Sequence, residues 1–80
     1  MNYSILLLDE INMKIEPIEN FKGTEHELKQ HLFELQEGYC QDEKPKVVKR
    51  TFKDENGNHI QCFCAFSESD YSYISPLKII

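Results

Sequence analysis

Hydrophobic and polar residues alternate along much of the chain with the period of two that is typical of β-strands. The run Ile5–Leu8 is apolar at every position, which predicts a strand over residues 2–8 that is covered on both faces inside a sheet. Residues 13–16 alternate as a half-buried strand does, and Pro17 places this strand at a sheet edge or at a strand end. The two segments predict a first hairpin.

The clearest local pattern is that of a helix from Glu25 to Glu37. It opens with a capping box, in which the Thr24 hydroxyl accepts a hydrogen bond from the N–H of Glu27 and the Glu27 carboxylate accepts one from the N–H of Thr24. Gly38 stands where a left-handed C-terminal cap belongs. One apolar stripe at helical spacing runs through Leu28, Leu32, Leu35 and Tyr39.

A second hairpin turns at Asp54–Asn58, and two loop geometries would pair its strands differently. A two-residue loop pairs Phe52 with Gln61, whereas a three-residue loop with Gly57 in the left-handed conformation pairs Phe52 with Ile60. We predict the second register, because the first mixes charge into both faces. One side of the hairpin then carries Val48, Phe52, Ile60, Cys62, Cys64 and Phe66. The other side carries Lys49, Thr51, Lys53, His59 and Gln61.

A last strand is indicated after the polar turn at residues 67–70. The side chains expected on one of its faces are Tyr71, Tyr73, Leu77 and Ile79. The order of elements is then β-β-α-β-β-β, which predicts an α+β fold with one helix packed on a mainly antiparallel sheet. Because 80 residues leave room for one core, we expect a single domain over residues 1–80, and the start Met and the strand-like end suggest a complete gene product.

The charge is unevenly distributed along the chain. The net charge is −5, but residues 1–43 carry ten acidic and three basic side chains, whereas residues 44–80 carry four acidic and six basic ones. The longest apolar run near the start spans four residues, shorter than the roughly 7–15 of a secretory signal or the about 20 of a membrane span, so we expect a cytoplasmic protein with no membrane contact. Overall acidity disfavours a dedicated nucleic-acid-binding protein, since basic side chains supply most of the affinity for phosphates.

Three cysteines are the soft metal ligands of the chain. Cys62 and Cys64 are two apart and point to the same side of a strand, but a second ligand pair for zinc is missing, since His59 faces the other way and Cys40 lies past the helix. An odd cysteine count does not form a secreted disulfide framework. We therefore expect free thiols packed in the core, and no metal, cofactor or catalytic residue.

The basic segment at residues 44–53 supports one hypothesis about function. It holds four lysines and one arginine, and Phe63 is expected beside Lys49 on the open face of the sheet. Basic side chains next to an exposed aromatic grip phosphates and stack bases, which favours a single-stranded nucleic-acid-binding module. The residues that would do so are Lys46, Lys49, Lys53 and Phe63. The alternative is a solvated strand whose lysines prevent edge-to-edge aggregation.

The acidic half of the chain supports the hypothesis that we prefer. We expect a small non-enzymatic inhibitor or regulator that engages a larger host protein with a basic, nucleic-acid-handling surface, where carboxylates take the place of phosphates. The side chains expected to bind this partner are Glu16, Glu19, Glu25, Glu27, Glu34 and Glu37. In size and charge the chain is similar to many short proteins of phages and mobile elements. Pairing of two copies through an exposed edge strand near the apolar C-terminus stays open.

Overall fold

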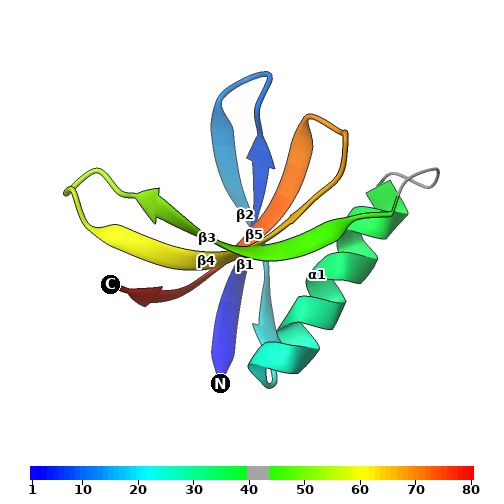
Figure 1. Cartoon of the computed structure of the whole chain (residues 1–80), viewed down its shortest axis with the longest axis horizontal. Coiled ribbons are helices and arrows are strands. Elements are labelled where there is room, and N and C mark those ends of the chain that lie inside the picture. Colours follow the sequence, from blue (N-terminus) through cyan, green and yellow to red (C-terminus); the bar gives the residue numbers. More distant parts are fainter. Residues whose placement is uncertain (40–43) are drawn as a thin grey trace.

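The computed structural model describes residues 1–39 and 44–80, which form one helix and a five-stranded sheet (Figure 1). The strands lie in the order β2-β1-β5-β4-β3, and all neighbours are antiparallel. The predicted α+β fold and element order are confirmed. The elements are β1 (Asn2–Asp9), β2 (Lys14–Lys22), α1 (Glu25–Tyr39), β3 (Lys46–Lys53), β4 (His59–Phe66) and β5 (Tyr71–Ile79).

The first hairpin has the strand positions that its sequence predicts. β1, with its continuous apolar run, lies between β2 and β5, whereas β2, which contains Pro17, is an edge strand. Ile5 pairs with Glu19 and Leu6 pairs with Pro17, so Ile18 is an extra residue that forms a bulge in β2. Proline fits at such a place, because its missing N–H removes no bond from the interior of the sheet.

The helix begins with the predicted capping box. The N–H of Thr24 donates to Glu27 Oε1 at 3.1 Å, and the N–H of Glu27 donates to Thr24 Oγ1 at 3.2 Å. Leu28 and Leu32 are fully buried. The helix does not end at Gly38, however, since it continues through Tyr39, and among the described glycines only Gly57 has a positive φ. The left-handed cap predicted at Gly38 is therefore wrong, because a glycine in the last turn costs too little to end a helix.

The second hairpin adopts the predicted three-residue loop. Val48 pairs with Cys64, and Phe52 pairs with Ile60. Gly57 has φ +84°, in the left-handed region that such a loop requires. The N–H of Asp54 donates to the carbonyl of Asn58 at 2.9 Å and closes the loop. The Asp54 carboxylate also accepts the backbone N–H groups of Asn56 and Asn58, so side-chain hydrogen bonds stabilise the turn.

The helix covers the face of this hairpin that was expected to be open to solvent. The helix packs on Phe63, Ala65 and Val47, and Phe63 is only 6% exposed. Lys49 does lie beside Phe63, with Nζ 5.7 Å from the ring centroid, but it covers a buried ring. The expected exposure of Phe63 is therefore wrong. Residues 62–65 are apolar on both faces of β4, so alternation alone does not say which face the helix covers.

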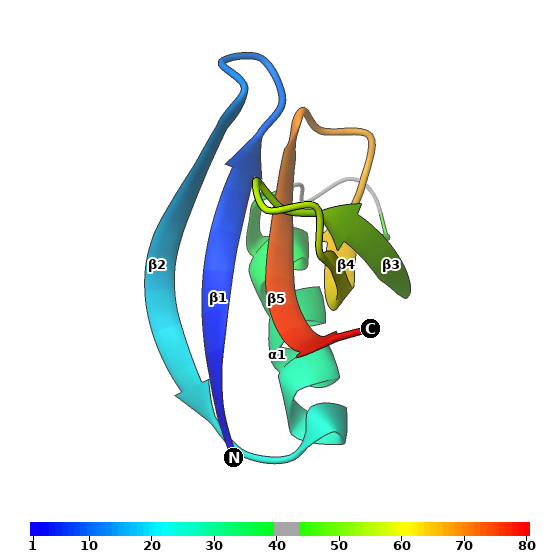
Figure 2. The ribbon, with the colours of Figure 1, turned by 90° about the vertical axis from the view of Figure 1, so that its left-hand side faces the viewer.

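The opposite face of the sheet is also partly buried, although no helix lies on it (Figure 2). Cys62, Cys64 and Ile74 are buried there. A pocket of about 220 Å³ on this face is lined by Ile15 of β2 and Phe52 of β3, which are the two edge strands. The sheet is therefore coiled strongly enough to bring both edges around one concave apolar surface.

The last strand differs from its expected pattern in two respects. A bulge at Leu77 lets Leu77 pack against the core while Ile79, which pairs with Ile60, lies on the other face and is 69% exposed. Ile79 therefore does not share a face with Tyr71, Tyr73 and Leu77. β5 also lies inside the sheet, so the edges available for pairing are β2 and β3 and not a strand near the C-terminus.

Gln36 anchors the second half of the helix to the rest of the fold. Its side chain is fully buried, and Nε2 donates to Ser67 Oγ and to the carbonyl of Tyr71, both at 3.0 Å. Its Oε1 accepts no hydrogen bond from the residues that the structure describes. The two bonds join α1 to the connection between β4 and β5, and so they set where the outer side of the helix points.

Candidate protein-binding surface

One side of the helix faces β2 and is rich in carboxylates. Glu27, His31 and Glu34 follow at spacings of four and three, so they form one stripe along α1. His31 Nε2 lies 2.9 Å from Glu19 Oε1, and its ring stacks on Phe21 with centroids 4.8 Å apart. These contacts direct the stripe toward β2.

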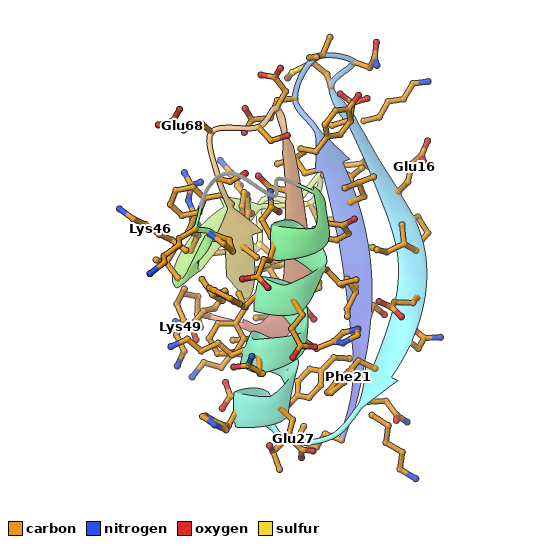
Figure 3. The ribbon with its side chains drawn as sticks, turned by 90° about the vertical axis from the view of Figure 1, so that its right-hand side faces the viewer. Glu16, Phe21, Glu27, Lys46, Lys49 and Glu68 are labelled. Atoms are coloured by element: carbon orange, nitrogen blue, oxygen red, sulfur yellow. The ribbon has the colours of Figure 1, made fainter. Side chains whose placement is uncertain are left out.

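The acids of β2 meet this stripe on the helix side of the sheet. Glu16 and Glu19 pair with alternate residues of β1, Leu7 and Ile5, and Ile5 belongs to the core under the helix. β2 and α1 run in opposite directions, so Phe21 lies near Glu27 and Glu16 lies toward the C-terminal end of the helix (Figure 3). We call these side chains, which are Glu16, Glu19, Glu27 and Glu34, the acidic flank, and we include Glu37, which follows Glu34 by three residues on the outward side of the helix.

Two members of the acidic flank already have structural partners. The Glu27 carboxylate accepts a hydrogen bond from the backbone N–H of Thr24, and hydrogen bonding to the backbone and the side chain of Thr24 holds the pKa of Glu27 below its ordinary value. Glu19 is bonded to His31. Glu16, Glu34 and Glu37 are exposed, and Glu34 makes only a long 3.4 Å contact with Gln30 among the bonds described. Recognition by the flank would therefore depend mainly on these three.

Glu25 does not join the other five predicted acidic residues. It lines a surface pocket together with Lys49 and Lys78, on the side of the helix that faces β3. Helix geometry explains the separation, since Glu25 is two residues from Glu27 and points about 200° away around the axis. Four of the six predicted residues therefore lie on the β2 side of the molecule, Glu37 lies on the outward side of the helix, and Glu25 lies among bases.

The predicted basic residues are divided between the two faces of β3. Lys49 and Lys53 share the helix side, whereas Lys46 is on the other side with Val48 and Arg50. Lys29 of α1 adds a further base on the β3 side of the helix, a neighbour that sequence reasoning missed. The helix thus separates β2, with Glu16, from β3, with Lys46 and Lys49 (Figure 3). With Phe63 buried, the predicted base-stacking platform is not assembled.

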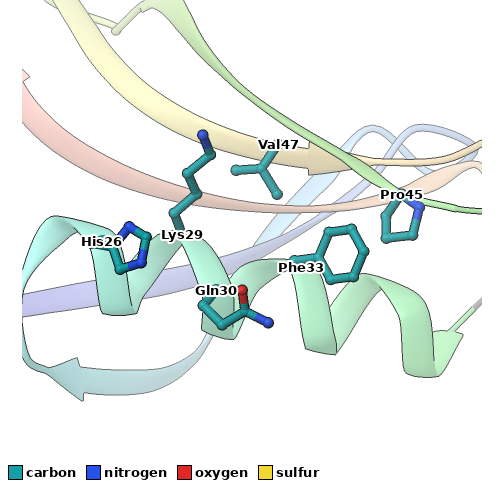
Figure 4. Close-up of a pocket in the computed structure, with 6 residues that line it drawn as sticks. All are labelled: His26, Lys29, Gln30, Phe33, Pro45 and Val47. Carbon is teal, nitrogen blue, oxygen red and sulfur yellow. The ribbon is translucent and has the colours of Figure 1, made fainter.

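A groove of about 330 Å³ lies between α1 and the edge strand β3 (Figure 4). Phe33, Pro45 and Val47 supply its apolar wall, while Lys29 extends along it beside Val47. His26 and Gln30 complete the lining. Sequence reasoning missed this groove, although Phe33 lies off the Leu stripe and an apolar residue at such a position is a sign of a second contact surface.

The two described cysteines are buried free thiols. Cys62 and Cys64 point to the same side of β4, as expected, and burial raises the pKa of both thiols. Within residues 1–39 and 44–80, no three His, Cys, Asp or Glu side chains are grouped so that they could hold a metal ion. The third predicted thiol, Cys40, lies outside the described residues. Protonated, buried thiols of this kind pack as small hydrophobic groups.

Comparison with known proteins adds no relative: no protein-family model, curated protein or solved structure matches the chain. In the part of the chain that the structure describes, no helix is both long and apolar enough to cross a membrane. The charged surface of the protein is therefore the basis for a functional proposal. It presents fixed charges of opposite sign on two sides of one helix, an arrangement suited to electrostatic recognition of another macromolecule.

Proposed function

We propose that the chain is a non-enzymatic protein-binding domain, an inhibitor or regulator, whose acidic flank engages a basic surface of a larger protein. The observation that supports this best is that carboxylates from two separate elements, β2 and α1, gather on one side of the molecule. The bases of β3 lie on the far side of the helix, so they do not neutralise this field.

The partner that fits such a surface is a protein that handles nucleic acid in the cytoplasm. Sites that bind phosphates are lined by lysine and arginine, and carboxylates at a similar spacing satisfy the same groups. Complementary charge also speeds the encounter between the two proteins. Glu16, Glu34 and Glu37 would make the contacts, and Glu19 and Glu27 would add to the field while they hold the fold together.

Single-stranded nucleic acid is a weaker candidate for direct binding. Lys46, Lys49 and Lys53 are exposed, but they point to two different faces of β3, and the aromatic ring of Phe63 is buried. Base stacking contributes about 1–3 kcal/mol per base in such modules, and this contribution would be missing. A mobility-shift titration with single-stranded DNA and RNA at about 50 mM salt, where electrostatic affinity is high, tests this alternative.

The proposal is tested by capture of partners from a bacterial lysate on the immobilised chain. Glu34→Lys and Glu37→Lys reverse charge at exposed positions of the helix, and Glu37→Lys also places a base in the last helical turn, which has none and where the helix dipole favours a base, so neither variant should unfold. Glu55→Lys changes the net charge equally in the exposed β3–β4 turn and is the matched control.

We expect one captured protein to be retained by wild type and by Glu55→Lys, lost with Glu34→Lys and Glu37→Lys, and released by high salt. A partner that is captured equally by all four proteins contradicts the proposal. So does a partner that Glu55→Lys loses to the same extent, because net charge and not the flank would then control binding.

A further inference from the structure

The groove between α1 and β3 lies beside an open edge of the sheet. β3 pairs with β4 on one side, and on the other side no described strand adjoins it. Asp54 and Asn58 form a hydrogen-bonded pair at the loop. Along the hairpin from there, non-hydrogen-bonded pairs, such as Lys53 with His59, alternate with hydrogen-bonded ones, such as Phe52 with Ile60. It follows that the backbone N–H and C=O groups of Val47, Lys49 and Thr51 point outward, away from β4.

The same three residues direct their side chains toward the helix. Val47 packs against the core under α1, and Lys49 lies over the ring of Phe63. A strand that paired with the outward groups would place alternate side chains directly beside Val47 and Lys49, on this helix side. Those side chains would enter the groove that Phe33 and Pro45 line.

The charge around the groove selects the chemistry of such a strand. Lys29 lies along its wall, Lys49 follows Val47 on the helix side of β3, and Lys53 continues this row toward the turn. The wall itself is apolar, at Phe33, Pro45 and Val47. A complementary segment therefore carries an apolar side chain opposite Val47 and an acidic one opposite Lys49.

We propose that an extended, acidic peptide segment of a partner protein adds to β3 as a sixth strand and places an apolar side chain in the groove between α1 and β3. This site is separate from the carboxylates of Glu16, Glu19, Glu27 and Glu34, since it lies on the other side of the helix. It can therefore exist whether or not the flank binds a basic surface.

The test uses a fluorescent, acetylated peptide of about six residues, Glu-Thr-Val-Thr-Glu-Thr, long enough to span the open part of β3 at about 3.4 Å per residue. Its Val and two Glu side chains share one face, so Val can lie opposite Val47 and Glu opposite Lys49 in either strand direction. Binding to the full chain is followed by anisotropy. Lys49→Pro removes an outward N–H, which an edge strand tolerates, and Lys49→Ala removes the same charge but keeps this N–H. Thermal unfolding of both variants shows whether the fold is kept.

We expect the peptide to bind wild type and to bind Lys49→Pro roughly three- to tenfold more weakly than Lys49→Ala, the effect of one net hydrogen bond. The same peptide with Lys in place of both Glu residues should not bind. Equal affinity of the two variants overturns the proposal, as does binding of the basic peptide, or failure of the acidic peptide to bind at about millimolar concentration, where weak strand addition is measurable.

Amide hydrogen exchange of the wild-type chain gives a second test that needs no variant. The peptide should slow exchange at Val47, Lys49 and Thr51 and leave Val48 and Arg50, which bond to β4, unchanged. Unchanged exchange at the outward amides contradicts strand addition. Protection of these amides that grows with the chain's own concentration assigns the edge to a second copy, and displacement of the peptide by single-stranded DNA assigns it to nucleic acid. Either result overturns the proposal.

Discussion

Gln36 offers a sharp test of how the helix is held. Its fully buried Nε2 group donates to Ser67 Oγ and to the carbonyl of Tyr71. Gln36→Glu keeps the shape of the side chain but replaces the amide donor with a carboxylate. At neutral pH the variant therefore loses both donated bonds, only the Ser67 hydroxyl can donate to the new carboxylate, and the charge lies beside the carbonyl oxygen of Tyr71.

The magnitude follows from these contacts. Two neutral hydrogen bonds contribute about 1 kcal/mol each, and a buried charge without a compensating partner costs about 3–5 kcal/mol. We expect Gln36→Glu to lower the free energy of unfolding by about 3–5 kcal/mol near pH 7. A chain of 80 residues has roughly 4–12 kcal/mol in total, so the loss should be easy to detect.

The pH dependence gives the reasoning a second check. Burial disfavours the charged form and so raises the folded-state pKa of the introduced carboxyl, which means that the protonated variant is the more stable one. Its deficit against wild type should shrink as the pH falls toward about 4, where the carboxyl is also protonated in the unfolded chain. Urea unfolding of both proteins across this range measures the difference. A deficit below about 1 kcal/mol at neutral pH, or one that does not change with pH, would refute the buried position of Gln36.

Three further predictions concern the cap, the thiols and the turn. Hydrogen bonding lowers the pKa of Glu27, so the ionised carboxylate stabilises the folded state. Urea titrations should show wild type more stable than Glu27→Gln, which can cap but cannot ionise, at neutral pH, and this difference should be lost as the pH falls below 4.5. In a Cys40→Ser background, Cys62 and Cys64 should react with a disulfide reagent only after unfolding, and rapid reaction of the native chain would contradict their burial. Gly57→Ala should cost about 1–2 kcal/mol because of the positive φ, as thermal unfolding can measure, and an unchanged midpoint would argue against the three-residue loop.

The parts of the fold that were predictable are those controlled by neighbouring residues. The hydrogen bonds between Thr24 and Glu27 join residues three apart, and they form as predicted. The hairpin register depends on Gly57 and its flanking strands, and it is also confirmed. Local chemistry of this kind needs no knowledge of the rest of the chain.

The incorrect predictions concern contacts between distant segments. Phe63 is buried because the helix covers that face of β4, whereas Cys62 and Cys64 are buried as expected, on the opposite face. A strand that is apolar on both faces gives no indication of which one the helix will cover. The residues next to Gln36 in the sequence give no sign that it is buried, since its partners are more than thirty positions away.

The candidate surface was predictable in composition but not in arrangement. Counting charges located an acidic first half and a basic strand. Only the fold brings Glu19 of β2 to the helix, and only helix geometry turns Glu25 toward Lys49 instead. Charged residues that are close in sequence can therefore lie on opposite sides of the molecule.

The most direct test of the acidic flank is an amide chemical-shift footprint of the isotope-labelled chain with its captured partner. We expect the amides of Glu16, Glu19, Glu34 and Glu37 and their neighbours to shift, and the shifts to disappear with Glu34→Lys. Shifts confined to the concave face around Ile74, or to the β3–β4 turn around Glu55, would contradict the claim that the carboxylates of β2 and α1 form the binding surface.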